Sequence, residues 1–188
     1  FFDIIPVTAK RKAIQRYFML GYHLDTARSL KEGTVIGPYT NYADLGKWGI
    51  SVFRFLDSIK DPVHILPHQA IALLERDVEH VRLTRFPDKP SRLCSLFAAR
   101  TLDELVMQWI PKLVKAEPVV WEVESQGVGS LHDAAWLDGL NIVVEVPPAD
   151  TGPDFERICK YWEGCFSSAP LPELLLPLPC RVVRRVTL

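Results

Sequence analysis

The stretch PLPELLL at residues 170–176 holds a single charged side chain, Glu173, in a run that is otherwise apolar. A carboxylate in apolar surroundings loses its hydration, so such a group stays at the rim of a core or has a chemical task there. Two other segments stand out upstream. YWEG at residues 161–164 carries an aromatic pair, and FPDKPSRLCSLF at residues 86–97 turns at its prolines before an apolar run. Glu173 is therefore the first candidate for a functional side chain.

The composition favours one globular domain. With 188 residues, of which 48% are hydrophobic, the chain can build a core of its own. Its formal net charge of −1 argues against a purely electrostatic grip on nucleic acid. No apolar run in the sequence approaches the length of a membrane span. Because the chain begins with Phe1 rather than Met, we expect residues 1–188 to be a single domain excised from a longer chain.

The cysteines favour a reducing compartment. None of them forms a CxxC pair, so a zinc site is not expected. A disulfide framework is not expected in a domain of this size either. We therefore expect the domain to work in the cytoplasm, either of the producing cell or of a target cell that receives it as part of a secreted effector. The cysteines are Cys94, Cys159, Cys165 and Cys180.

Hydrophobic spacing, capping signals and prolines divide the chain into mixed helices and strands. Pro67 opens a helix, Thr101 and Glu104 form a capping box for another, and Gly164 ends a third. Helices are predicted at 50–59, 67–82, 101–113 and 154–162, and strands at 16–20, 93–98, 119–124, 141–146 and 181–188, with a further short strand after Gly33. The elements follow no regular βαβ rhythm, which predicts an α+β domain.

Several common motifs are missing. Neither GxGxxG nor GxxxxGK[ST] occurs, so a dinucleotide is not held in the Rossmann manner. HExxH and GxSxG are absent as well, and GVGS at residues 127–130 is interpreted as a loop. The histidines show no ligand spacing apart from His64 and His68, which lie on either side of Pro67.

The order of segments resembles a family of uncharacterised bacterial domains grouped with the ADP-ribosyltransferase-like folds. The chain is similar to that family in SLKEGTVI at 29–36, in the helix end EHVR at 79–82 with residues 86–97 behind it, in YWEG at 161–164 and in PELL at 172–175. The resemblance implies an α+β domain with a split, mainly antiparallel β-sheet and flanking helices. It also implies that NAD binds as substrate in a cleft of that sheet.

The resemblance implies roles for single residues. Glu173 matches a late-strand glutamate that contacts the nicotinamide ribose and supports cleavage of the nicotinamide bond. Arg92 suits the pyrophosphate, Ser91 the nicotinamide ribose, and Tyr161 a stacking position on the nicotinamide ring, with Trp162 in the core.

Each of these roles has a structural alternative. Glu173 could be a solvated carboxylate on a loop, and Arg92 could pair with a neighbouring acid while Ser91 caps a turn. Tyr161 and Trp162 could both belong to the core.

The family usually has a His or Arg on its first strand for the adenosine side of NAD. In this chain Arg16, Tyr17 or His23 could serve, and Tyr17 is the candidate that we name.

The resulting expectation is an ADP-ribosyltransferase, a glycosyltransferase that moves ADP-ribose from NAD to a protein or nucleic acid without a metal. We expect it to act as a bacterial toxin or effector domain whose cleft an immunity protein plugs. Two rivals remain open. One is a non-catalytic binding module on the same fold, and the other is a toxin with an unrelated nuclease mechanism, which the lack of clustered metal ligands disfavours.

Overall fold

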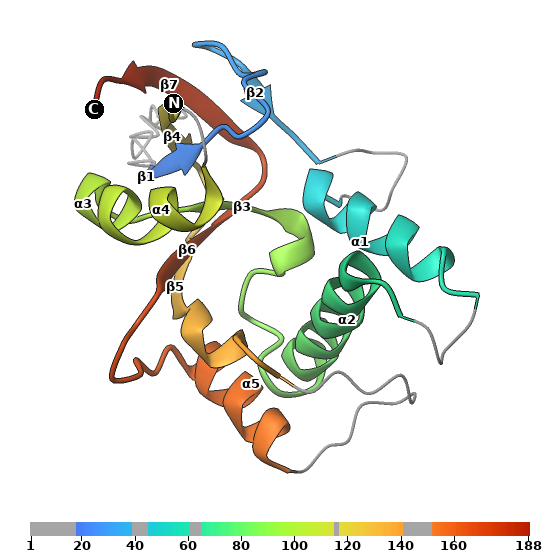
Figure 1. The fold of residues 1–188 in the computed structure, drawn as a ribbon. Helices are drawn as coiled ribbons and strands as arrows, with labels where there is room; N and C mark the ends of the chain where they lie inside the picture. Colours follow the sequence, from blue (N-terminus) through green and yellow to red (C-terminus); the bar gives the residue numbers. More distant parts are fainter. Residues whose placement is uncertain (1–17, 39–44, 61–64, 115–116, 141–151) are drawn as a thin grey trace, which may run out of the picture.

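The computed structural model describes residues 18–38, 45–60, 65–114, 117–140 and 152–188, which form two antiparallel sheets with flanking helices (Figure 1). The strands are β1 (Met19–Leu24), β2 (Val35–Ile36), β3 (Ser95–Ala98), β4 (Val120–Ser125), β5 (Ser130–Asp133), β6 (Pro172–Pro177) and β7 (Cys180–Val186). The longer helices are α1 (Lys47–Asp57), α2 (Pro67–Arg85) and α5 (Pro153–Glu163). Shorter turns of helix are η2 (Arg92–Cys94), α3 (Leu102–Glu104), η3 (Leu105–Trp109), α4 (Ile110–Leu113) and η4 (Ala134–Leu137). The predicted α+β class is confirmed.

The two sheets are connected by a backbone bridge and by side chains packed between them. Their strand orders are β1-β4-β7-β2 and β3-β6-β5, and every strand pairing in the described ranges is antiparallel. Tyr22 of β1 and Ala99, just after β3, exchange backbone hydrogen bonds of 2.8 Å in both directions. This bridge joins the sheets at the second half of β1 and the end of β3.

Strand β6 is the buried centre of the fold. Leu174 and Leu176 pack toward the four-stranded sheet, in one cluster with Val123 and Val182. Leu175 points the other way, into the cluster of α2 and α5. Because side chains alternate along a strand, Glu173 shares the face of Leu175 and points toward the helices.

Helices α1, α2 and α5 gather on one side of the molecule, and α3 and α4 lie beside β1 (Figure 1). Val78 and Val81 of α2 pack against Ile158 and Trp162 of α5 in one core cluster. Of the helices that the structure describes, none combines the length and apolar character that crossing a membrane requires.

The local signals for helix boundaries are confirmed, whereas two strands were missed. Helix α2 begins at Pro67, Thr101 and Glu104 form both bonds of a capping box, and Gly164 ends α5 in the left-handed conformation at φ +77°. The loop predicted at 127–130 is wrong at its last residue, which begins β5. Strand β6 was not predicted from the residue pattern and was implied only by the resemblance, through the late-strand position of Glu173. The strand expected at 141–146 lies outside the described residues.

Candidate functional site

A cleft of about 440 Å³ lies next to the bridge between the two sheets. Residues of β1, β3, β6, α1, α2, η2, η3 and α4 line it, so segments from most of the chain meet there. Its aromatic lining consists of Tyr22, Trp48, Phe97 and Trp109, and its other titratable lining residues are His23, Glu75, Arg92 and Glu173. An apolar cleft with a few convergent polar groups is the usual form of a small-molecule site.

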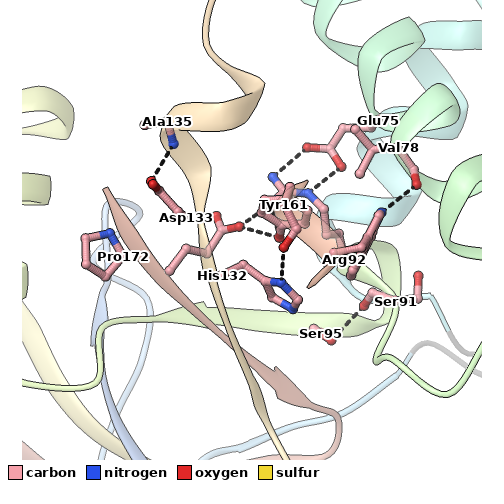
Figure 2. A network of polar contacts seen from close by, with 12 residues as sticks. Glu75, Val78, Ser91, Arg92, Ser95, His132, Asp133, Ala135, Tyr161 and Pro172 are labelled. Atoms are coloured by element: carbon pink, nitrogen blue, oxygen red, sulfur yellow. Dashed lines mark hydrogen bonds and ion pairs between the residues drawn. The ribbon is translucent and has the colours of Figure 1, made fainter. Parts of the chain in front are cut away.

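Arg92 is the centre of a buried ion network at this cleft (Figure 2). Its guanidinium donates two parallel hydrogen bonds to Glu75, from Nε to Oε2 at 2.9 Å and from Nη2 to Oε1 at 2.8 Å. Its Nη1 donates to Oε1 of Glu173 and, at 2.7 Å, to the hydroxyl of Tyr161. That hydroxyl in turn donates to the same Oε1 of Glu173 at 2.7 Å. Charge-assisted hydrogen bonds thus tie four distant parts of the chain together.

Local structure explains how each member of the network reaches its place. Glu75 lies in the middle of α2, on the face that packs against the rest of the protein. Arg92 opens η2, whose first turn is capped by the hydroxyl of Ser91, which accepts from the amide of Leu93 at 3.1 Å. Glu173 is the second residue of β6 and faces the helices.

Burial governs the protonation of the network. The side chains of Glu75 and Glu173 are only 5% and 6% exposed. Burial raises the pKa of Glu173, although the charge of Arg92 and the hydrogen bond from Tyr161 limit the rise. Burial lowers the pKa of Arg92, but the charges of Glu173 and Glu75 outweigh it and the pKa ends above its ordinary value. Two carboxylates share one guanidinium, so the network has one negative charge in excess when both are ionised.

A second cavity, of about 570 Å³, adjoins the first. His23, Trp48 and Phe97 line both cavities, and we call the two together the long cleft. At this junction Nδ1 of His23 lies 2.8 Å from the carbonyl oxygen of Phe97, and burial lowers the pKa of the imidazole. The second cavity is lined by several polar side chains, among them Asp25, Thr26, Ser29, Thr34, Lys47, Ser51 and Ser95.

Asp133, fully buried at the end of β5, fixes the segment that leads to Glu173. Its Oδ1 accepts from the amides of Ala135 at 3.0 Å and Leu171 at 2.7 Å, and its Oδ2 accepts from Ser167 at 2.7 Å. Burial raises the pKa of this carboxyl, but the hydrogen bonds outweigh it and the pKa falls below its ordinary value. The start of β6 is therefore anchored by an ionised side chain.

Trp162 lies in the core as expected, but the ring of Tyr161 is buried beside it instead of facing the cleft. Both side chains are completely buried. Adjacent helix residues can both be buried here because α5 ends between α2 and β5. Trp162 donates from Nε1 to the carbonyl of Val78 at 2.9 Å, and the ring of Tyr161 stacks on His132 with centroids 4.6 Å apart. Tyr161 thus reaches the network through its hydroxyl, and its ring is not available for stacking on a ligand.

The structure brings Glu173, Arg92 and the hydroxyl of Tyr161 together, whereas Ser91 lies apart from them. Arg92 forms ion pairs with Glu75 and Glu173, which agrees with the alternative of a salt bridge. Its guanidinium is therefore not free to bind a pyrophosphate. Ser91 caps a turn, also as its alternative has it, and lines a separate cavity. Tyr17 lies outside the described residues. Within the described ranges, no three His, Cys, Asp or Glu side chains are grouped so that they could hold a metal ion.

Two residues of the cleft were not selected from the sequence. Glu75 carried a readable signal, because it lies three residues from both Ala72 and Val78 and so falls on the buried face of a predicted helix. His23 was named only among several choices for the first strand, yet it lines both cavities.

Comparison with known proteins gives one family. Residues 51–187 match the model of a family described as "Protein of unknown function (DUF2441)". The matched region contains all four residues of the ion network, whereas β1 and His23 precede it. No curated protein matches the chain.

Proposed function

The chain belongs to the DUF2441 family, and we propose that it transfers ADP-ribose from NAD to a protein or nucleic acid, with Glu173 as the catalytic carboxylate. The observation that carries the proposal is the place of Glu173, on a late strand at an aromatic-lined cleft beside the bridge between two antiparallel sheets. This arrangement supports an ADP-ribosyltransferase-like split sheet, in which such a glutamate contacts the nicotinamide ribose.

The lining of the long cleft suits the two ends of NAD. The nicotinamide ring is flat and positively charged, and both the faces of aromatic rings and the excess negative charge of the ion network attract such a ring. Phe97 and Trp109 supply the aromatic faces in the first cavity. In the second cavity, Lys47 and the hydroxyls of Thr26 and Ser51 offer donors to phosphate and ribose oxygens.

The proposed reaction breaks the bond between the nicotinamide nitrogen and C1′ of the ribose. The bonding electron pair leaves with nicotinamide, which becomes neutral, and positive charge develops on the ribose. An ionised Glu173 in a dry site stabilises that charge. A nucleophilic atom of the acceptor then bonds to C1′ and loses its proton to Glu173 or to water. Arg92 and Tyr161 fix Oε1 of Glu173, so Oε2 is the oxygen that we assign to the ribose.

A binding module without turnover is the second candidate, and the ion network itself favours it. Arg92 already balances the charge of Glu173, and a paired carboxylate stabilises a developing positive charge less than a free one. In this alternative, a flat cationic molecule occupies the cleft and is not cleaved.

An assay of nicotinamide release separates the two candidates. The purified chain is incubated with NAD, with and without cell lysate, and ADP-ribose adducts are sought by mass spectrometry. Glu173→Gln keeps the shape of the side chain and removes its charge, so we expect release to fall on the order of 10²–10³-fold. The control is Glu163→Gln, an exposed carboxylate at the end of α5, which should leave release unchanged.

The other outcomes are equally informative. Calorimetric binding of NAD without release supports the binding module. Neither binding nor release refutes the use of NAD, and full release by Glu173→Gln removes Glu173 from the catalytic role.

A further inference from the structure

The wall of the first cavity opposite the ion network contains a π-helix. In η3 the amide of Ile110 donates to the carbonyl of Leu105, a bond that spans five residues. Pro111 explains the wide turn, because a proline lacks the amide donor and its ring clashes with the carbonyl four residues earlier. The cleft is lined by three residues of this segment at successive spacings of four, namely Leu105, Trp109 and Leu113.

Trp109 also contacts the strand that carries Glu173. Its indole Nε1 donates to the carbonyl oxygen of Pro172 at 2.7 Å. The carbonyl of Leu171 accepts a hydrogen bond from the amide of Ala134, on the β5 side of β6. Successive carbonyls along a strand point to opposite sides, so the carbonyl of Pro172 faces the β3 side. Strand β3 pairs with β6 only from Leu174 onward. The indole therefore takes the place of a strand partner immediately before Glu173.

We infer that Trp109 is a positioning residue for Glu173, which links the wall of the cleft to its carboxylate. The Trp109 side chain lines the cleft, while its indole N–H holds the peptide that precedes Glu173. A ligand that packs against Trp109 then also stabilises the position of the carboxylate. The catalytic part of this inference rests on the proposed function, whereas the positional part does not.

The chain offers a matched control for the test. Trp136 makes the same kind of bond, from its indole Nε1 to the carbonyl of Cys165 at 2.8 Å, but it lies outside the cleft lining. Trp109→Phe and Trp136→Phe each keep an aromatic ring and remove one indole donor. The two variants therefore differ in which backbone carbonyl loses its partner.

Hydrogen–deuterium exchange tests the position of β6 without any substrate. We expect Trp109→Phe to speed amide exchange in residues 173–176, which carry the amide hydrogens of β6, about two- to tenfold, the factor that corresponds to one neutral hydrogen bond. Trp136→Phe should leave exchange in that segment unchanged. Unchanged exchange in Trp109→Phe, or an equal increase in both variants, overturns the inference.

Steady-state nicotinamide release tests the catalytic consequence. Misplacement of a catalytic group lowers turnover more than binding, so Trp109→Phe should reduce kcat on the order of 10- to 100-fold and change KM for NAD little. A rise in KM at unchanged kcat shows that Trp109 only binds the ligand, and it overturns the positioning role. If the wild-type chain releases no nicotinamide, the proposed function fails, and a selective change in exchange still supports Trp109 as the anchor of Glu173.

Discussion

Replacement of Arg92 by alanine should destabilise the protein severely. The substitution removes the guanidinium that pairs with Glu75 and Glu173, whose side chains are 5% and 6% exposed. Removing one partner of a buried ion pair typically costs about 3–5 kcal/mol, because an uncompensated charge stays behind. Here two carboxylates lose their partner, so we expect the upper part of that range. A typical domain is stable by about 5–15 kcal/mol, so the variant should lie near the limit of folding.

The destabilisation of Arg92→Ala should depend on pH in a defined direction. Burial raises the pKa of Glu173, and the charge of Arg92 limits that rise, so the pKa should be higher still in the variant. A folded-state pKa above the unfolded value, which is about 4.3 for glutamate, favours the native state at low pH. This stabilisation is complete below the unfolded pKa and is lost as the pH rises through the folded pKa. The deficit relative to wild type should therefore be smaller at pH 5 than at pH 7.

Urea denaturation followed by circular dichroism at pH 5 and pH 7 measures both effects. Arg184→Ala is the matched control, because Arg184 also donates two hydrogen bonds to a glutamate, Glu122, but is exposed on β7. Its unfolding midpoint should stay close to that of the wild type. A loss below about 1 kcal/mol in Arg92→Ala, the range of a solvated pair, would refute the reasoning from burial. A large loss of stability would agree with the alternative in which Arg92 pairs with neighbouring acids rather than with a pyrophosphate.

Two further predictions concern His132 and Tyr161, whose rings stack on each other. Burial lowers the pKa of His132 to about 4. Between pH 6.5 and pH 4, the unfolded chain therefore binds a proton at His132 that the native protein does not bind. The stability of the native state that is present above pH 6.5 is lost as the pH falls through this range. His132→Phe should remove roughly 3 kcal/mol of this acid sensitivity, measured as the difference between unfolding free energies at pH 7 and pH 4, and an unchanged difference contradicts it. Tyr161→Phe removes the hydroxyl that bonds to Arg92 and Glu173, and it should cost about 1.5–3 kcal/mol in urea denaturation at pH 7. A cost equal to that of Arg92→Ala would show that the hydroxyl, rather than the ion pairs, holds the network together.

Helix boundaries could be predicted from the sequence because their causes are local. Pro67 lacks an amide hydrogen, which needs no partner in the first turn of a helix, and Thr101 and Glu104 bond within one turn. Gly164 ends α5 at φ +77°, a conformation that glycine adopts without strain. Each of these signals is contained in a few neighbouring residues.

Strand β6 could not be recognised in the same way. It is buried on both faces and therefore shows no alternation of polar and apolar residues, and it begins and ends with a proline. Short apolar runs of this kind do not distinguish a central strand from other buried structure. The loop interpretation holds for residues 127–129 and misses only Ser130, because β5 gains its strand character from pairing with β6.

The candidate site was predictable in its parts but not in its connections. Glu173 and Arg92 were selected for their chemistry, yet they are separated by 81 residues in the chain, and Arg92 and Glu75 by 17. Which acid faces which guanidinium depends on how α2, η2 and β6 pack. Helical spacing predicted that Tyr161 points away from the core face of its helix. Other elements also pack over the Tyr161 side of α5, so Tyr161 is buried as well.

The excess negative charge of the ion network also determines which ligands the cleft favours. Glu75 and Glu173 together carry one negative charge more than Arg92 can balance, and burial keeps water from screening it. Either a proton on Glu173 or a cation in the cleft relieves this excess. A proton and a cationic ring therefore compete for the same carboxylate. A neutral flat molecule gains nothing from the charge, so the buried network favours a positively charged ring over an uncharged one of equal shape.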